Sequence, residues 1–244
     1  MKNTAIIIPT RLEARRFPNK PLEKINNIPM IVHVFNRAKE SNVGEVFVAT
    51  PDEEIINAVK ENDGQTILTK KEHLSGSDRV YEAYIKTHLK DKADLIINLQ
   101  GDMPNIKPSS ILKLEKLMRD TKSEIGTLAS PIQDIQENED INIVKVDLEK
   151  KLENRNFLIA KNFFRKKADL KIQNLYHHIG IYAFTSKALT KYVNLPRSRL
   201  EIERNLEQMR ALENDIVIKV GLSDSMPLSV DTENDLIKVR KEMN

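Results

Sequence analysis

Short apolar runs alternate along the chain with longer segments in which apolar residues recur every three or four positions. The short runs predict buried strands and the longer segments predict amphipathic helices. In the first half we expect strands at Thr4–Ile8, Glu45–Thr50, Thr66–Leu68, Leu95–Leu99 and Ile125–Ala129. We expect helices at Met30–Ser41, Glu53–Asn62, Gly76–Leu89 and Ser109–Asp120. This alternation is typical of an α/β protein with a mainly parallel sheet covered by helices on its faces.

The second half of the chain is less regular. Strands are expected at Ile143–Val146, His178–Phe184 and Ile216–Val220, and Thr232 is expected to cap a last helix through Arg240. We interpret 147–177, a stretch rich in Lys, Asn and Glu, as a smaller excursion from the sheet, a lid or a dimer arm. A length of 244 residues without a repeat or linker predicts a single domain over 1–244.

Composition narrows the class of protein. Hydrophobic residues make up 40% of the chain and charged residues 31%, which suits a soluble protein with a core. The net charge of +3, with acids and bases interleaved, argues against a nucleic acid partner. The chain has no cysteine, which excludes disulfides and thiolate metal sites and fits a cytoplasmic location. No signal-peptide pattern precedes Pro9 and no apolar run reaches the roughly 18 residues that span a bilayer, so membrane insertion is not expected.

The first predicted strand leads into a basic loop that carries Arg11, Arg15, Arg16 and Lys20. In open α/β sheets, ligands bind at the carboxyl ends of the strands. Arg and Lys supply positive charge for phosphate oxygens, Arg as a planar fork and Lys as a point charge. A lone Arg or Lys is more often an ordinary surface residue. Four cations directly after the first strand predict a polyphosphate site.

Two aspartates end apolar segments that are far apart in the sequence. Asp102 follows Gly101 after the strand Leu95–Leu99, and Asp231 follows Leu228–Val230. Two carboxylates that end apolar segments suit Mg²⁺, which takes oxygen ligands and shares them with substrate phosphates. The alternatives are that Asp102 caps a turn and that Asp231 starts a helix.

Further candidates lie in three more motifs. Ser75 and Arg79 flank a helix start that offers N–H groups to an anion, although Arg79 in an ion pair with Asp78 is the alternative. Period-two alternation places His178 and Tyr182 on one face of a strand, where an ordinary half-buried histidine is the alternative. The adjacent His177 and His178 disfavour a zinc site, because they point to opposite faces. Glu207 and Gln208 open a helix whose side chains bind hydroxyls or form a solvated face.

Taken in order, these motifs resemble the 3-deoxy-manno-octulosonate cytidylyltransferase family over nearly the whole chain. The matching segments are Ile7–Arg11, Arg16–Leu22, Pro29–Val34, Val48–Asp52, Ser75–Arg79, Gln100–Pro104, His178–Tyr182, Leu206–Arg210 and Val230–Thr232. The resemblance implies a three-layer α/β/α, Rossmann-like nucleotidyltransferase fold. It also implies transfer of CMP from CTP to the anomeric hydroxyl of a 3-deoxy-octulosonic acid, with Mg²⁺ as cofactor and release of pyrophosphate, for lipopolysaccharide biosynthesis.

The resemblance also implies a role for each candidate residue. Arg11 and Lys20 would hold the triphosphate, with Arg16, Ser75 and Arg79 near it, and Gln100 would contact the cytosine. Asp102 and Asp231 would bind the metal, and Arg11, Lys20 and Asp102 would be the catalytic residues. The sugar pocket would be lined by His178, Tyr182, Glu207 and Gln208. No protein nucleophile is expected, the partners are CTP and an acid sugar, and a homodimer is expected.

Two segments depart from the family pattern. Met103 replaces the family's Glu after Asp102, and Phe157–Arg165 stands where the family has Tyr-Phe-Ser-Arg followed by Ile-Pro. Lys161 is then expected to replace the missing Arg as partner of the sugar carboxylate, without its fork geometry. The acceptor is therefore Kdo (3-deoxy-manno-octulosonate) or another acid sugar, such as an 8-amino octulosonate or a nonulosonate. Two rival hypotheses are a CTP-binding homologue without turnover and a glycosyltransferase, although no Asp-x-Asp pair follows the central strand.

Overall fold

The structure is a computed structural model, and it describes residues 3–13, 16–133, 135–151, 153, 157–165 and 174–243. The chain divides into two compact units. Unit 1 consists of Met1–Leu112 and Pro227–Asn244, and unit 2 consists of Lys113–Met226. The expectation that residues 1–244 act as one nucleotidyltransferase domain stays a prediction.

Unit 1 contains a parallel sheet with the strand order β5-β4-β1-β6. Its strands are β1 (Thr4–Pro9), β4 (Glu45–Thr50), β5 (Thr66–Leu68) and β6 (Leu95–Leu99), and a hairpin is formed by β2 (Lys24–Ile25) and β3 (Ile28–Pro29). Its helices are the 3₁₀ turn η1 (Lys20–Leu22), α1 (Met30–Glu40), α2 (Glu53–Lys60), α3 (Gly76–Lys86) and α9 (Glu233–Glu242). Helix α4 (Pro108–Thr121) runs through the unit boundary in the sequence.

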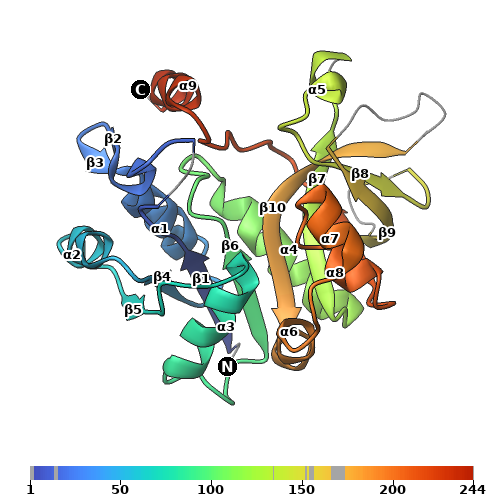
Figure 1. Cartoon of the computed structure of the whole chain (residues 1–244), viewed down its shortest axis with the longest axis horizontal. Helices are drawn as coiled ribbons and strands as arrows, with labels where there is room; N and C mark the ends of the chain where they lie inside the picture. The colour runs from blue at the N-terminus through green and yellow to red at the C-terminus, as the bar shows by residue number, and fades with distance from the viewer. Residues whose placement is uncertain are drawn as a thin grey trace. The chain divides into compact units, whose positions relative to one another are not determined.

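Burial explains why these segments of unit 1 are strands. Every residue of β1 and of β6 is buried, as expected for parallel strands that are covered on both faces. Helix α1 packs on β4 and α3 on β1 (Figure 1). The apolar stripe of α1 that the sequence predicts, which includes Ile31, Val34 and Phe35, is buried. The carboxyl ends of β1 and β6, which are neighbouring parallel strands, therefore meet at one edge of the sheet.

Unit 2 contains a mixed sheet with the strand order β10-β7-β11-β9-β8, in which β8 pairs with β10 as well. Its strands are β7 (Ile125–Pro131), β8 (Lys145–Leu148), β9 (Phe157–Phe164), β10 (Leu175–Thr185) and β11 (Ile218–Leu222). Its helices are α5 (Ile135–Glu139), α6 (Ser186–Val193), α7 (Arg199–Arg204) and α8 (Met209–Leu212). Only the β7–β11 pairing is parallel among the described strands of unit 2, so the parallel sheet that the sequence predicts lies in unit 1.

The predicted elements agree with the structure except in the second half. Strands β4, β5 and β6 have the predicted bounds, and α9 begins after Thr232 as expected. Strand β9 was not predicted, since it lies in the stretch interpreted as an excursion from the sheet. It pairs with β8 and β11, so Phe157–Phe164 belong to the sheet of unit 2. Lys161 and Asn162 interrupt the apolar pattern, which hides this strand in the sequence. Residues 147–148 and 175–177 likewise belong to β8 and β10. For the residues of 147–177 outside these strands, a lid or dimer arm stays a prediction.

Candidate functional site

Lys20 in unit 1 joins two aspartates that are remote from it in the sequence. Its Nζ atom lies 2.7 Å from the carbonyl oxygen of Val230, 3.3 Å from Oδ2 of Asp102 and 3.5 Å from Oδ1 of Asp231. Arg16 reaches the other oxygen of Asp231, at 2.9 Å. The structure thus brings together four residues that the sequence singled out, which we name the charge cluster (Arg16, Lys20, Asp102 and Asp231).

Apolar packing beneath the charge cluster explains its assembly. Phe17 and Ile25, on either side of Lys20, are buried with Val230, Leu236 and Val239 around the start of α9. The Val230 N–H donates to the Asp102 carbonyl at 2.9 Å, which ties the two aspartate segments together. Thr232 caps α9 in a capping box with Asp235. These contacts place side chains that are more than 200 residues apart around one ammonium group.

The two neighbours of Asp102, Gly101 and Met103, are closely packed. A Cβ atom on Gly101 would lie 3.2 Å from Thr10 Cβ and 3.3 Å from the Pro9 carbonyl oxygen, so the backbone approaches β1 closely. Met103 is buried, and its carbonyl accepts a hydrogen bond from the Ile106 N–H. A methionine at the position of the family's Glu therefore packs in the core of unit 1.

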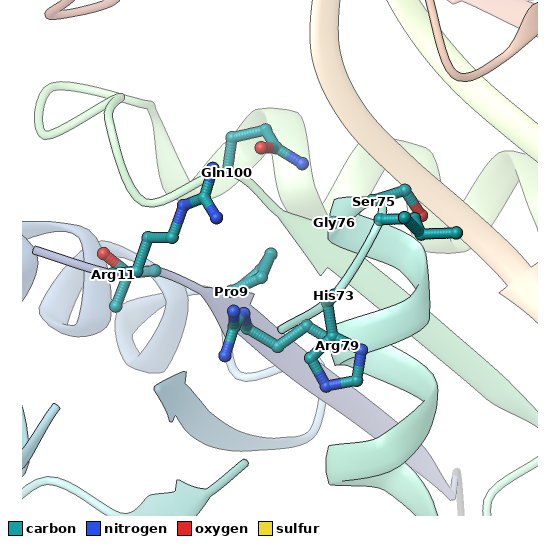
Figure 2. A pocket seen from close by; sticks show the side chains of 9 residues that line it. Pro9, Arg11, His73, Ser75, Gly76, Arg79 and Gln100 are labelled. Carbon is teal, nitrogen blue, oxygen red and sulfur yellow. The ribbon is translucent and has the colours of Figure 1, made fainter. Parts of the chain in front are cut away.

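A pocket of about 240 Å³ lies at the end of β1 in unit 1 (Figure 2). Three of its lining residues are predicted nucleotide ligands with charged or amide side chains: Arg11, Arg79 and Gln100. Ser75 also lines it, and its hydroxyl caps α3 by accepting from the Asp78 N–H at 3.2 Å. The backbone beside Arg11 is held by Asp52, whose Oδ2 accepts from the Leu12 N–H at 2.7 Å. Asp52 stands at the start of α2, but its side chain does not cap that helix.

The buried Arg79 side chain stabilises the wall of the pocket by hydrogen bonds. Its guanidinium donates to the Thr69 hydroxyl at 2.5 Å and to the carbonyl oxygens of Lys70 and Lys71 at 3.0 and 3.1 Å. Burial lowers the pKa of Arg79, and the charge of Arg11 lowers it further. The two guanidinium groups therefore act on each other electrostatically while both line the pocket.

Glu82 stabilises the segment that carries His73, which lines the same pocket. Its carboxylate accepts from the Lys70 N–H at 3.0 Å and from Lys86 Nζ at 2.6 Å, and it lies 2.5 Å from Nε2 of His73. Burial opposes the charge of Glu82, but these hydrogen bonds outweigh it and lower its pKa to about 2. The segment that carries His73 is thus anchored to α3 at both of its ends.

His178 in unit 2 is a neutral, oriented imidazole. Burial lowers its pKa to about 3, so the imidazole is uncharged at neutral pH. Its Nε2 lies 3.0 Å from the hydroxyl of Thr127, which donates to the Ile181 carbonyl at 2.6 Å. Because that hydroxyl hydrogen is used, the Thr127 oxygen accepts from His178 Nε2–H. The Nδ1 atom of His178 is then a hydrogen-bond acceptor.

Tyr182 lies beside His178 in unit 2, and Glu207 acts electrostatically on Tyr182. The Tyr182 ring centroid is 5.3 Å from that of His178, and β10 carries an irregularity between Ile179 and Tyr182. Within the part of the chain that the structure describes, the buried Tyr182 hydroxyl has no hydrogen-bond partner. Burial raises the pKa of Tyr182, and the charge of Glu207 raises it further. The carbonyl of Glu207 accepts from the Tyr192 hydroxyl at 2.6 Å.

The remaining two sugar-side candidates occupy different environments. Gln208 is buried at the start of α8. Lys161 is exposed on β9 at an irregularity of the β8–β9 register, where it acts electrostatically on Asp147. Burial raises the pKa of Asp147, and the charge of Lys161 opposes that rise.

Several side chains that hold the candidates have no motif of their own. They are Asn98, which contacts Gln100; Thr127, which contacts His178; Tyr192, which contacts Glu207; and His73, which lines the pocket. Thr127 lies opposite Tyr182 in the β7–β10 pairing, a strand register that no local pattern of the sequence shows. Arg15, one of the four cations of the predicted loop, lies outside the described residues.

The oxygen donors of the charge cluster fit a hard divalent cation. Asp102 and Asp231 offer carboxylate oxygens around one point, and the Val230 carbonyl lies beside them. Across the described ranges, no group of three or more His, Cys, Asp or Glu side chains is placed to hold a metal ion. Two carboxylates suit Mg²⁺, which binds few protein ligands and keeps water or phosphate in its shell.

None of the helices in the described residues is long and apolar enough to cross a membrane.

Comparison with known proteins supports the resemblance seen in the sequence. Residues 5–219 match the family described as "Cytidylyltransferase". A 3-deoxy-manno-octulosonate cytidylyltransferase from Bartonella tribocorum is 42% identical over 97% of this chain and 96% of its own. One from Bradyrhizobium sp. is 41% identical over 97% of this chain and 95% of its own.

Solved structures have the same fold. The structure of CMP:2-keto-3-deoxy-manno-octonic acid synthetase complexed with CTP has a TM-score of 0.88 at 35% identity and covers 98% of both chains. The 4-diphosphocytidyl-2C-methyl-D-erythritol synthase of Anaerococcus prevotii, at 13% identity and a TM-score of 0.66, shares the fold over 98% of this chain and 97% of its own. The predicted nucleotidyltransferase fold is confirmed. The chain belongs to the cytidylyltransferase family and, within it, to the 3-deoxy-manno-octulosonate cytidylyltransferases.

Proposed function

We propose that this protein transfers CMP from CTP to the anomeric hydroxyl of Kdo. The anomeric oxygen forms a bond to the α-phosphorus, the bond from that phosphorus to the bridging oxygen breaks, and pyrophosphate leaves. The hydroxyl proton passes to solvent or to a phosphate oxygen. The observation that carries the proposal is the convergence of Arg16 and Lys20 with Asp102 and Asp231 in a member of this family.

The cations of unit 1 are suited to the triphosphate. Arg11 lines the pocket, while Lys20 lies in the charge cluster. Phosphoryl-type transfer depends on in-line positioning and neutralisation of charge rather than on a protein nucleophile. Arg11 and Lys20 would therefore hold phosphate oxygens and stabilise the charge that develops on the leaving pyrophosphate.

We include Mg²⁺ as the cofactor, with Asp102 and Asp231 as its protein ligands. When bound, the ion supplies positive charge that orients the α-phosphate and favours ionisation of the attacking hydroxyl. Lys20 contacts both carboxylates, so it also keeps them in place. From the resemblance to the 3-deoxy-manno-octulosonate cytidylyltransferases, we further propose that the protein is a cytoplasmic homodimer that serves lipopolysaccharide biosynthesis.

Neutral groups of unit 2, together with the charged Glu207, are suited to the sugar. His178 offers an acceptor at Nδ1, the buried Tyr182 hydroxyl offers a donor, and Glu207 accepts hydroxyl protons in hydrogen bonds. Gln208 adds an amide that donates and accepts. Groups that keep one protonation state discriminate hydroxyl positions by geometry.

Pyrophosphate release from CTP and Mg²⁺ tests the proposal, measured with Kdo, an 8-amino octulosonate and a nonulosonate as acceptors. We expect the highest kcat/KM for Kdo. The departure of Phe157–Arg165 from the family pattern, with Lys161 in place of the missing Arg, favours a second candidate, in which another acid sugar is the acceptor. A higher kcat/KM for either the 8-amino octulosonate or the nonulosonate would select that candidate. CTP binding without release on any sugar would leave a homologue that has lost turnover.

A further inference from the structure

A chain of three polar side chains leads from the pocket of unit 1 into its core. Gln100 donates from Nε2 to Oδ1 of Asn98 at 3.1 Å, and Asn98 donates from Nδ2 to the Ser77 hydroxyl at 3.4 Å. Asn98 is 1% exposed and Ser77 is 3% exposed. Gln100 lines the pocket together with Arg11 and Arg79 (Figure 2).

Asn98 is a polar residue in an otherwise apolar strand. It lies in the buried strand β6, whose remaining four residues are Leu95, Ile96, Ile97 and Leu99. Asparagine is depleted in strands, and a buried amide must find hydrogen-bond partners. Both ends of the Asn98 amide are used in this chain of contacts, which links the pocket-lining Gln100 to α3.

A primary amide has one accepting end and one donating end, so two neighbouring amides must meet oxygen to nitrogen. With its nitrogen on Ser77, Asn98 presents its oxygen to Gln100. Gln100 must then meet it with its own nitrogen, which leaves Oε1 of Gln100 without a protein partner among the described residues. Because the Ser77 hydroxyl donates as well as accepts, the charges around Gln100 decide between this arrangement and the one in which both amides are turned over.

The charges of the pocket favour the first of these arrangements. Arg11 and Arg79 both line it, and the charge of Arg11 lowers the pKa of the buried Arg79, which burial already lowers. A carbonyl oxygen is stabilised by this positive potential, whereas an N–H₂ group in its place would be repelled. The potential therefore selects the arrangement in which Gln100 presents its oxygen.

We propose that Asn98 is a positioning residue that makes Gln100 present an acceptor to the nucleobase. A free amide oxygen pairs with the exocyclic amino group of cytosine and repels the carbonyl oxygen at the same place on uracil. Asn98 thereby sets the preference for CTP over UTP from a position that does not touch the base. The inference deepens the proposed function and rests on it, because it takes Gln100 to contact the base of the bound nucleotide.

The test is calorimetric binding of CTP and UTP, each with Mg²⁺, to the full chain and its variants, so that no turnover is needed. We expect the wild type to bind CTP more tightly. Asn98→Leu frees the Gln100 amide to turn over, so the ratio of the two dissociation constants should fall about tenfold, the value of one hydrogen bond. Asn98→Asp still accepts from Gln100 and should keep the ratio within about threefold. In Asn98→Leu combined with Gln100→Glu, the glutamate presents oxygen in either orientation, so the preference should return.

These comparisons separate positioning from a merely structural role, because loss of folded protein weakens both nucleotides equally. A melting curve accompanies each variant, and Asn98→Ala replaces Asn98→Leu if that variant does not unfold cooperatively. The inference is overturned if the wild type does not prefer CTP or if Asn98→Leu keeps the wild-type ratio of dissociation constants. It is also overturned if Asn98→Asp lowers that ratio as much as Asn98→Leu does. If the wild type prefers CTP and the variants behave as expected but no sugar yields pyrophosphate, the proposed turnover fails and the inference about Asn98 stands.

Discussion

The two candidate binding regions use opposite electrostatic strategies. In unit 1, the charge cluster keeps full charges in contact at half-buried positions, where the side chains of Lys20, Asp102 and Asp231 are 16%, 26% and 34% exposed. In unit 2, burial keeps titratable groups neutral, since it lowers the pKa of His178 to about 3 and raises that of Tyr182. One region is built from ions, while the second relies mainly on uncharged donors and acceptors beside the charge of Glu207.

This difference matches the two substrates that the family joins. A triphosphate carries several charges, which require cations and oxygen-bound metal rather than a particular shape. A sugar differs from its competitors in the placement of hydroxyl groups, which oriented neutral groups read by hydrogen bonding. The comparison therefore predicts that substitutions in unit 1 act through charge and those in unit 2 through geometry and protonation.

The largest effect is expected for Asp102→Asn. The amide keeps the shape of the side chain but removes the negative charge beside Lys20 and, in our proposal, a metal ligand. The Asp102 carbonyl, which ties in Val230, is unchanged. We expect kcat to fall by about 10³-fold with an unchanged melting temperature, measured by pyrophosphate release over a series of Mg²⁺ concentrations.

Asp224→Asn is the matched control for this substitution. Asp224 forms an exposed ion pair with Lys113, at 3.0 Å, in unit 2. Exposed pairs contribute little to stability, so this variant should keep wild-type kinetics. Unchanged Mg²⁺-dependent activity in Asp102→Asn would remove Asp102 from the metal site.

A smaller effect is expected for Lys20→Met, which keeps much of the apolar stem and removes the ammonium. The KM for CTP should rise by about 10- to 100-fold, while the KM for the sugar changes little. Initial-rate kinetics with each substrate varied in turn provide the measurement. Lys24→Met, at an exposed position of the same unit, is the control. An equal loss for both substrates would contradict a role on the nucleotide side alone.

The approach of Asp102 to the basic loop of Arg16 and Lys20 was predictable from the sequence, because each follows a strand that ends at the same sheet edge. Asp102 follows β6 and the basic loop follows β1, and neighbouring parallel strands bring their carboxyl ends together. The contact with Asp231 was a prediction from its own apolar segment, and it depends on packing between Phe17 and Val230. No periodic pattern encodes that contact.

The supporting residues were not predictable, because they act across strands. Thr127 reaches His178 through the β7–β10 register, and that register contains an irregularity that no local pattern indicates. Strand β9 was missed for a related reason, since its exposed Lys161 lies where the β8–β9 register shifts. Local periodicity predicts which elements form, but pairing and irregularities decide which side chains meet.

Lowering the pH should reveal the contribution of the buried, neutral His178 of unit 2 to the free energy of unfolding. Because burial lowers the pKa of His178 from 6.5 to about 3, the unfolded chain binds its proton first as the pH falls. The stability contributed by neutral His178 is therefore present above pH 6.5 and is lost as the pH falls from 6.5 toward 3, by about 1 kcal/mol per pH unit.

Urea denaturation of the wild type and His178→Gln across this range measures the loss. Glutamine has no titrating group and retains a donor for Thr127, so the variant should lack this part of the slope. Glu82, whose buried carboxylate is held by hydrogen bonds at a pKa of about 2, contributes equally to both proteins and cancels. Parallel stability curves for the two proteins would show that His178 titrates normally in the folded state.

The smallest effect is expected for Lys161→Ala, which tests whether unit 2 adds any full charge to sugar binding. Lys161 is exposed on β9, where water screens its attraction for a carboxylate. We therefore expect the KM for the acid sugar to rise only about threefold with an unchanged KM for CTP. Lys187→Ala, an exposed lysine on α6, should leave both constants unchanged. An unaltered sugar KM in Lys161→Ala would make Lys161 peripheral, and sugar binding in unit 2 would then depend on its uncharged groups and Glu207.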